Sequence, residues 1–211
     1  MAEPFPGTPF LLYNGHMPRL PRKFYARPTE QVARELLGQR LVRVLDGRRL
    51  SGLITETEAY IGQEDLACHA RFGLTPRTTV MFGAPGYAYV YFTYGMHWML
   101  NVVSEPAGHP AAVLIRAIVP EEGLEVMQAL RPRPARTPAR LTDGPAKVAQ
   151  ALAIDKSLNG RDLCARGAEL FIERARAIPD HAVVLGPRIG LNNTPEPWKG
   201  VLWNYKAEIG D

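Results

Sequence analysis

The sequence predicts a single α+β domain: a curved, mainly antiparallel β-sheet flanked by helices, with a protruding β-hairpin. Hydrophobic residues make up 46% of the 211 residues, which is enough for one core and excludes disorder of the whole chain. Several runs rich in β-branched and aromatic residues have short connections, which favours antiparallel pairing. No stretch separates two complete sets of core elements. We therefore expect an extended N-terminal arm over residues 1–20 and one domain over residues 21–211.

The expected elements follow one another along the chain. Thr29 serves as the N-cap of a helix that Gly38 ends, and Asp46-Gly47 forms a turn between two strands. Strands are expected at residues 41–45, 51–60, 87–95, 97–104, 111–119, 168–175 and 181–186. Helices are expected at residues 29–38, at 121–130 with Glu121 and Glu122 in the first turn, and from about Pro145 to Leu152.

The charge of the chain is unevenly distributed. The 25 basic and 21 acidic side chains give a net charge of +4, which is compatible with a polyanionic partner but too small to establish one. Residues 1–50 hold 9 basic and 4 acidic side chains, whereas residues 51–105 hold 2 basic and 5 acidic ones. An acidic, aromatic stretch therefore follows a basic one, and a module that binds by charge alone is not expected to have this pattern.

Cysteine usage and hydropathy indicate the cellular setting. Cys68 and Cys164 are the two cysteines, and neither belongs to a CxxC pair. No apolar run approaches the ~20 residues of a membrane span, and the N-terminus lacks the pattern of a secretion signal. We expect an intracellular protein that makes no membrane contact.

One strand carries two carboxylates. Alternation over residues 51–60 places Glu56, Glu58 and Tyr60 on one face, with the two carboxylates ~7 Å apart. This spacing suits acid–base hydrolysis. Tyr60 would give Glu58 a partly desolvated wall, which suits a general base. The alternative interpretation is a solvated face at a sheet edge.

A metal site is not expected near His69. Glu64 and Asp65 lie close to it in sequence, but there is no HxxxH or HExxH spacing, and the other histidines are scattered. A lone histidine is more often a hydrogen-bonded structural residue or a stacking surface.

A ribbon of tyrosines follows. Tyr87, Tyr89 and Tyr91 share one face of a strand, a pattern that usually indicates packing in a core or an interface. Tyr94, however, stands beside a glycine at the expected hairpin tip and is followed closely by Met96. Large apolar side chains at a tip are costly to expose, so we expect this tip to meet a partner. If the partner is DNA, the tip can act as a wedge between bases.

Four separate blocks follow one another along the chain: ETEAYIGQEDLACHA, MFGAPGYAYVYFTYGMHWMLNVVS, VLIRAIVPEEGLEVM and DGPAKVAQALAIDKSLNGRDL. Together they resemble the alkyladenine (3-methyladenine) DNA glycosylase family, and their order and spacing hold from about residue 20 to residue 191. The resemblance implies an enzyme that hydrolyses the N-glycosidic bond of damaged purines in double-stranded DNA without a metal or cofactor.

The resemblance implies catalytic roles for three residues. Glu58 matches the general base that activates the attacking water, and Arg116 matches the arginine that helps to hold that water. Ile189 matches a position whose main-chain carbonyl also touches the water. Glu56 is then expected to be structural.

The resemblance also implies residues that hold the base and the DNA. Tyr60, His69 and Tyr91 match the side chains that sandwich the extruded base, Asn101 matches the residue that discriminates against guanine, and Ala67 lies among them. Tyr94 matches the tyrosine that fills the vacated space in the duplex, with Met96 beside it, and Arg77 and Lys147 are expected near the DNA backbone.

The sequence departs from the family pattern at two places, and two other functions remain as alternatives. His97 stands where relatives often have tyrosine, and the loop over residues 104–110 is longer than in relatives.

A metal-dependent phosphoesterase would use Glu58, Asp65 and His69. A non-catalytic module would bind damaged DNA without cutting it. The blocks that hold Glu58 and Arg116 contain no lysine, so we expect a monofunctional enzyme, and we expect a monomer because one pocket and one wedge suffice.

Overall fold

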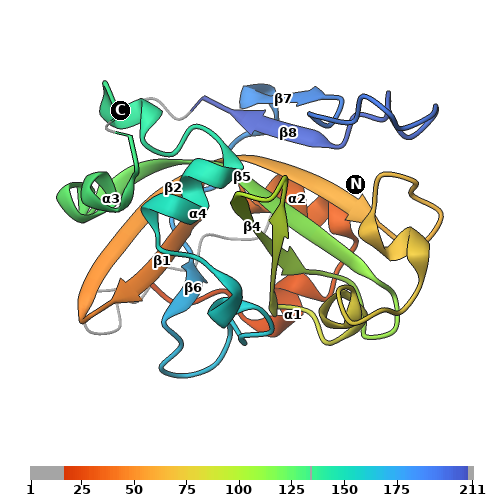
Figure 1. The fold of residues 1–211 in the computed structure, drawn as a ribbon, viewed down its shortest axis with the longest axis horizontal. Coiled ribbons are helices and arrows are strands. Elements are labelled where there is room, and N and C mark those ends of the chain that lie inside the picture. Colours follow the sequence, from red (N-terminus) through yellow and green to blue (C-terminus); the bar gives the residue numbers. More distant parts are fainter. Residues whose placement is uncertain (1–16, 134, 209–211) are drawn as a thin grey trace, which may run out of the picture.

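One eight-stranded antiparallel sheet organises the chain. A computed structural model describes residues 17–133 and 135–208. The main path of the sheet runs β3-β4-β5-β2-β1-β6, while β8 pairs with both β2 and β7. The sheet curls into a half-barrel (Figure 1), which confirms the predicted α+β class. The strands are β1 (Arg40–Leu45), β2 (Arg48–Ile61), β3 (Ala88–Thr93), β4 (His97–Val103), β5 (Ala111–Glu122), β6 (Leu170–Glu173), β7 (Val183–Gly186) and β8 (Asn204–Ala207).

The long strand β2 is the centre of the fold because it changes partner along one edge. Residues 48–53 pair with β1, and residues 56–58 pair with β8, while β5 runs along the opposite edge. The register shifts around Ile54 and Glu56, where the change takes place. Glu58 consequently lies between Leu114 of β5 and Asn204 of β8. The alternative of a solvated sheet edge is therefore wrong.

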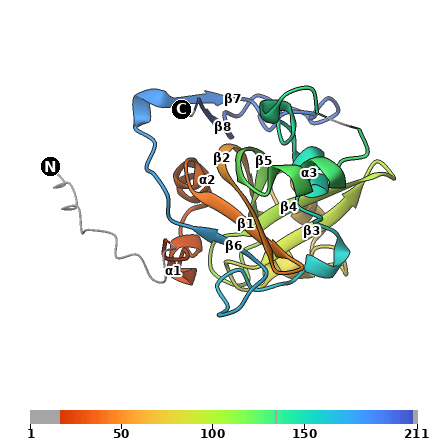
Figure 2. The same cartoon turned by 90° about the vertical axis from the view of Figure 1, so that its left-hand side faces the viewer.

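Within the described part of the chain, four α-helices accompany the sheet. Figure 2 shows α1 and α2 on one side of the molecule and α3 on the other. The hydroxyl of Thr57 in β2 donates to the carbonyl of Ala33 in α2. Because neighbouring residues of a strand point to opposite faces, α2 covers the face of β2 that is turned away from Glu58. The helices are α1 (Arg22–Tyr25), α2 (Thr29–Leu36), α3 (Leu124–Leu130) and α4 (Pro145–Ala151).

Two predicted helix starts are wrong. Thr29 is the first residue of α2 and not its N-cap. Its backbone N–H and its hydroxyl donate to Glu105, so a distant carboxylate replaces the local cap. Glu121 and Glu122 end strand β5 and do not open a helix. Gly123 at φ 74° breaks the strand, and α3 begins at the next residue.

The N-terminal arm is described in part. Residues 1–16 of the predicted arm lie outside the described residues. Beyond them, Arg19 pairs with Glu173, and the N–H of Leu20 donates to Ile172 of β6. Leu20 is also buried in the core. The last residues of the predicted arm are thus attached to the sheet.

No helix in the described residues is long and apolar enough to cross a membrane.

Gly123 and Gly47 allow a matched test of the packing behind β2. Both have φ 74°, but a Cβ on Gly123 would meet Leu50 and would lie 2.9 Å from the carbonyl oxygen of Arg49, whereas Gly47 has open space. Gly47→Ala should lower the free energy of unfolding by about 1 kcal/mol through backbone strain alone. Gly123→Ala should lower it by about 3 kcal/mol, because overpacking adds to the strain. Urea denaturation measures both, and equal losses would contradict the packing argument.

Candidate active site

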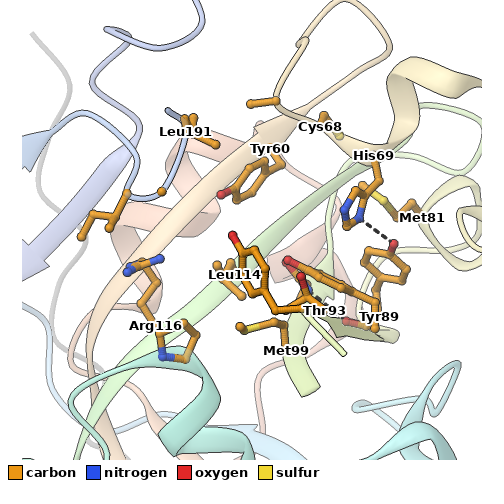
Figure 3. A pocket seen from close by; sticks show the side chains of 17 residues that line it. Tyr60, Cys68, His69, Met81, Tyr89, Thr93, Met99, Leu114, Arg116 and Leu191 are labelled. Carbon is orange, nitrogen blue, oxygen red and sulfur yellow. Dashed lines mark hydrogen bonds between the residues drawn. The ribbon is translucent and has the colours of Figure 1, made fainter. Parts of the chain in front are cut away.

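A cavity of about 330 Å³ lies where β2, the β3–β4 hairpin, the loop after β2 and the segment after β7 meet. Figure 3 shows Tyr60 and His69 along one wall and Arg116 at the other side of the view. The structure brings most of the predicted site residues together here. Those that line the cavity are Tyr60, Ala67, His69, Tyr91, Tyr94, Asn101, Arg116 and Ile189.

The carboxylate of Glu58 is fully buried against this cavity and accepts four hydrogen bonds. Its Oε1 accepts from the amide of Ile189 (2.7 Å) and from Nδ2 of Asn204 (3.2 Å). Its Oε2 accepts from the hydroxyl of Tyr60 (2.8 Å) and from Nη1 of Arg116 (3.2 Å). An ionised carboxylate has about four lone-pair sites, and all of these donors stabilise its charge against burial. Tyr60 is therefore a donor to Glu58 as well as a wall beside it.

A second carboxylate lies next to this network. Glu56 Oε1 accepts from Nε of Arg116 (2.9 Å) and from Nδ2 of Asn204 (2.8 Å). Burial lowers the pKa of Arg116, but the attraction of Glu58 and Glu56 more than offsets it, so the pKa ends above the usual value. Arg116 is thus a permanent cation that contacts both carboxylates. Neither Glu56 nor Glu58 is among the residues that line the cavity. Glu58 lies directly behind its wall, because Tyr60, Arg116 and Ile189, which line the cavity, all donate to its carboxylate.

The aromatic walls of the cavity are uncharged at neutral pH. Burial, together with Arg77 and Arg71, lowers the pKa of His69 to about 4. The ring of His69 meets that of Tyr91 edge to face, with 4.5 Å between centroids. Burial and the nearby charge of Glu58 hold the pKa of Tyr60 well above its usual value. The walls therefore present neutral aromatic surfaces.

The tip of the β3–β4 hairpin has an unusual backbone. Tyr94 and Gly95 both have positive φ, at 52° and 68°, and the N–H of Met96 donates to the carbonyl of Thr93. Asn or Asp normally precedes the glycine in such a turn, because a bulky side chain strains the left-handed conformation. Tyr94 is nevertheless 78% exposed and Met96 is 65% exposed. Strain and apolar exposure at one position point to a function.

The two predicted backbone contacts lie near the cavity. The guanidinium of Arg77 is 5.1 Å from the ring centroid of Tyr91, and its Nη2 is 3.4 Å from Nε2 of His69. Lys147 lies in α4 and pairs with Asp143, one turn earlier. Both are cationic groups at the rim, and their contact with DNA stays a prediction.

A buried ion pair that the sequence did not predict packs behind the wall of the cavity at Tyr60. Arg188 and Asp65 are both fully buried, with 2.9 Å between Nη2 and Oδ1. The guanidinium of Arg188 lies between the rings of Tyr60 and Trp203, at 4.7 and 5.0 Å from their centroids. Because both oxygens of Asp65 bind Arg188, they are engaged, which counts against Asp65 as a ligand in the phosphoesterase alternative. The described residues contain no cluster of three His, Cys, Asp or Glu side chains that could hold a metal.

Other residues of the site were also missed. Alternation along the strands that hold Tyr91, Asn101 and Arg116 could have found four of them, Tyr89, Thr93, Met99 and Leu114. The other positions lie outside these strands and have no such signal. The missed residues that line the cavity are Cys68, Met81, Tyr89, Thr93, Met99, Leu114, Pro145, Gly190 and Leu191, and Asn204 contacts Glu58 from outside it.

Known proteins resemble this chain over most of its length. The family model described as methylpurine-DNA glycosylase (MPG) matches residues 23–208. A protein of Methanocella arvoryzae named "Putative 3-methyladenine DNA glycosylase" is 52% identical over 187 residues, which cover 87% of this chain and 92% of that protein. Proteins with the same name from Myxococcus xanthus and Carboxydothermus hydrogenoformans are 50% and 47% identical, covering 82% and 89% of this chain and 82% and 96% of their own.

The chain belongs to the methylpurine-DNA glycosylase family, which confirms the resemblance seen in the sequence. It is a hydrolytic DNA glycosylase, and its substrate is DNA.

The strain at Tyr94 predicts a gain in stability when this residue is replaced. Asn tolerates the left-handed backbone and suits this turn, so Tyr94→Asn should raise the free energy of unfolding by about 1 kcal/mol. Met96→Asn, at an exposed neighbour without positive φ, should leave it unchanged. Thermal or urea unfolding checks both variants. A loss of stability in Tyr94→Asn would contradict the strain.

Proposed function

We propose that the protein flips damaged purines out of duplex DNA and hydrolyses their N-glycosidic bond, leaving an abasic site. The range would include alkylated purines and extend to deaminated and etheno purines. The observation that carries the proposal is the buried carboxylate of Glu58, held by four donors at the wall of a neutral aromatic cavity. The cavity volume lies at the lower end of the range for small-molecule sites, which suits a single base.

Flipping is required because the glycosidic bond of a stacked base cannot be reached. It costs a few kcal/mol, least for a damaged or mispaired base. Tyr60, His69 and Tyr91 would stack on the extruded base, and such stacking contributes about 1–3 kcal/mol per base. The amide of Asn101, held by a 3.1 Å bond to the carbonyl of Tyr89, would select against the 2-amino group of guanine.

The chemistry needs one carboxylate. The water oxygen bonds to C1′ of the sugar while the C1′–N9 bond breaks. The electron pair of the broken bond leaves with the purine. The water proton passes to Glu58, and Arg116 with the carbonyl of Ile189 would hold the water. A purine alkylated at N3 or N7 carries positive charge and leaves neutral, so a second carboxylate is not required. Hypoxanthine and ethenoadenine are uncharged in DNA, so each must take up a proton from the solvent in order to leave as a neutral base. Glu58 would also stabilise the sugar cation that develops.

Residues around the cavity would contact the DNA. Tyr94, beside Met96, would enter the duplex and fill the space left by the base, as apolar wedges do. Arg77 and Lys147 would approach phosphates, which position a protein without reading sequence. The strained, exposed ring of Tyr94 supports this role.

The alternative of a non-catalytic module that binds damaged DNA does not agree with the family of this chain. Against it stands the cost of burying Glu58. An anionic group next to an anionic backbone, removed from water, lowers stability and affinity unless its charge is used. A binding module gains nothing from such a group.

Base release tests the proposal. We expect the protein, in the presence of a chelator, to form abasic sites in duplexes that contain hypoxanthine or ethenoadenine, or in methylated DNA. Glu58→Gln should abolish release yet retain binding to the same duplexes, because the amide cannot take a proton. Glu64→Gln, at an exposed acidic residue, is the matched control. Binding without release by the unaltered protein would favour the module. Full activity of Glu58→Gln would refute the general base.

The wedge is tested by comparing two substrates. Tyr94→Ala should slow base release from duplex DNA by about 10-fold or more, because the gap in the stack is left unfilled, and should affect single-stranded DNA much less. Tyr94→Phe retains the ring and should behave as the unaltered protein. Equal losses on both substrates would count against a wedge.

A further inference from the structure

Asn204 differs from the other donors to Glu58. Tyr60, Arg116 and Ile189 line the cavity, whereas Asn204 lies outside it. Its position is set by the sheet, because Asn204 of β8 is in register with Glu58 of β2. The side chain is buried, at 6% exposure. Asn204 thus approaches the carboxylate from behind the site.

The amide of Asn204 joins the two carboxylates. Its Nδ2 lies 2.8 Å from Oε1 of Glu56 and 3.2 Å from Oε1 of Glu58. An amide nitrogen carries two hydrogens, so it can donate to both at once. Two neighbouring anions repel each other, and a donor shared between them offsets the repulsion. Arg116 bridges the same two carboxylates from the cavity side.

Each of the two carboxylate oxygens of Glu58 has its own pair of donors. Oε1 is held by Asn204 and by a backbone amide, while Oε2 is held by Tyr60 and Arg116. With about four lone-pair sites filled, Glu58 can accept a proton only if one donor withdraws. The hydroxyl of Tyr60 can rotate. The Nη1 bond of Arg116 is long at 3.2 Å, and its Nε stays 2.9 Å from Glu56 when that bond is released. Oε2 is therefore the oxygen that can be freed.

We propose that Asn204 is a positioning residue that anchors Oε1 of Glu58 and thereby directs the proton of the attacking water to Oε2. The proposal rests on the proposed hydrolysis by Glu58. Without Asn204, Oε1 would keep the amide of Ile189 alone, and the repulsion by Glu56 would be less compensated. The carboxylate would then turn away from the cavity or take up a proton before the reaction.

The charged and titratable groups that face Glu58 are few. Strand β2 contributes Glu56 and Tyr60, and β5 contributes Arg116. Strand β3 contributes Tyr91, whose pKa is raised by burial and, among smaller causes, by the charge of Glu58. Strand β8 contributes the neutral amide of Asn204, and the segment after β7 contributes a backbone amide. A change at Asn204 can therefore be read in the pH dependence of the reaction.

Single-turnover release of hypoxanthine from a duplex, measured between about pH 5 and pH 9, tests the proposal. Asn204→Leu retains the size and removes the donor. We expect release about 10- to 100-fold slower, as for loss of a hydrogen bond to a charged group. The dissociation constant of the duplex should change less than about 2-fold, because Asn204 lies outside the cavity. Lys206→Leu, at an exposed position of the same strand, should behave as the unaltered protein.

Asn204→Asp gives a second readout, and it tests the positioning role on its own if the Asn204→Leu variant does not fold. It retains the shape but places a third carboxylate beside Glu56 and Glu58. The acid limb of the pH–rate profile should move up by about one pH unit or more, because the added negative charge favours protonation of the neighbouring carboxylates. At alkaline pH the rate should rise but stay below that of the unaltered protein, because an ionised aspartate at this position cannot donate to Oε1. A structural role would lower the rate equally at every pH, and that result would overturn the proposal.

The positioning role of Asn204 would also be overturned by a second result. In that result both Asn204 variants release base at rates within about 2-fold of the Lys206→Leu rate, and the acid limb of the pH–rate profile does not move. If the unaltered protein releases no base from any lesion, the proposed function has failed. An active enzyme that is indifferent to Asn204 contradicts the positioning role alone.

Discussion

The burial of one negative charge determines how this molecule is assembled. The carboxylate of Glu58 lies in the middle of a sheet, shielded from bulk solvent, where an uncompensated charge would be very costly. Its compensation comes from four parts of the chain: its own strand, β5, β8 and the segment after β7. The last two lie more than a hundred residues away in sequence. The C-terminal part of the chain therefore belongs to the site as much as the strand that carries Glu58.

The support of the cavity follows from the same constraint. Ile189 can donate to Glu58 because its neighbour Arg188 is fixed by Asp65 and by the aromatic rings on both sides. A buried pair of this kind is weak evidence for stability, since its desolvation offsets much of its attraction. Its geometric effect is clear, however: it joins the loop after β2, the wall at Tyr60 and the segment after β7 at one point.

Local patterns predicted what depends on neighbouring residues. Alternation placed Glu58 and Tyr60 on one face, and the hairpin turn at Asp46-Gly47 lies where it was expected, between β1 and β2. The prediction was wrong where a distant group replaced a local one, as at Thr29, whose N–H is capped by Glu105. Asn204 escaped prediction because its value depends on pairing between β8 and β2, across a separation of 146 residues. No periodicity within a short stretch carries that information.

Two features that cost stability belong to the same site: the left-handed backbone of Tyr94 and the buried charge of Glu58. Two hairpins of the sheet have turns with positive φ at two successive residues, ending in glycine. In Asp46-Gly47 the first residue suits that backbone, whereas in Tyr94-Gly95 it does not, and its ring is exposed as well. The unsuited turn is the one at the mouth of the cavity, close to the buried charge of Glu58. A sequence selected only for stability would retain neither feature. Their coincidence at one site is the physical argument that the strain and the buried charge serve the same reaction.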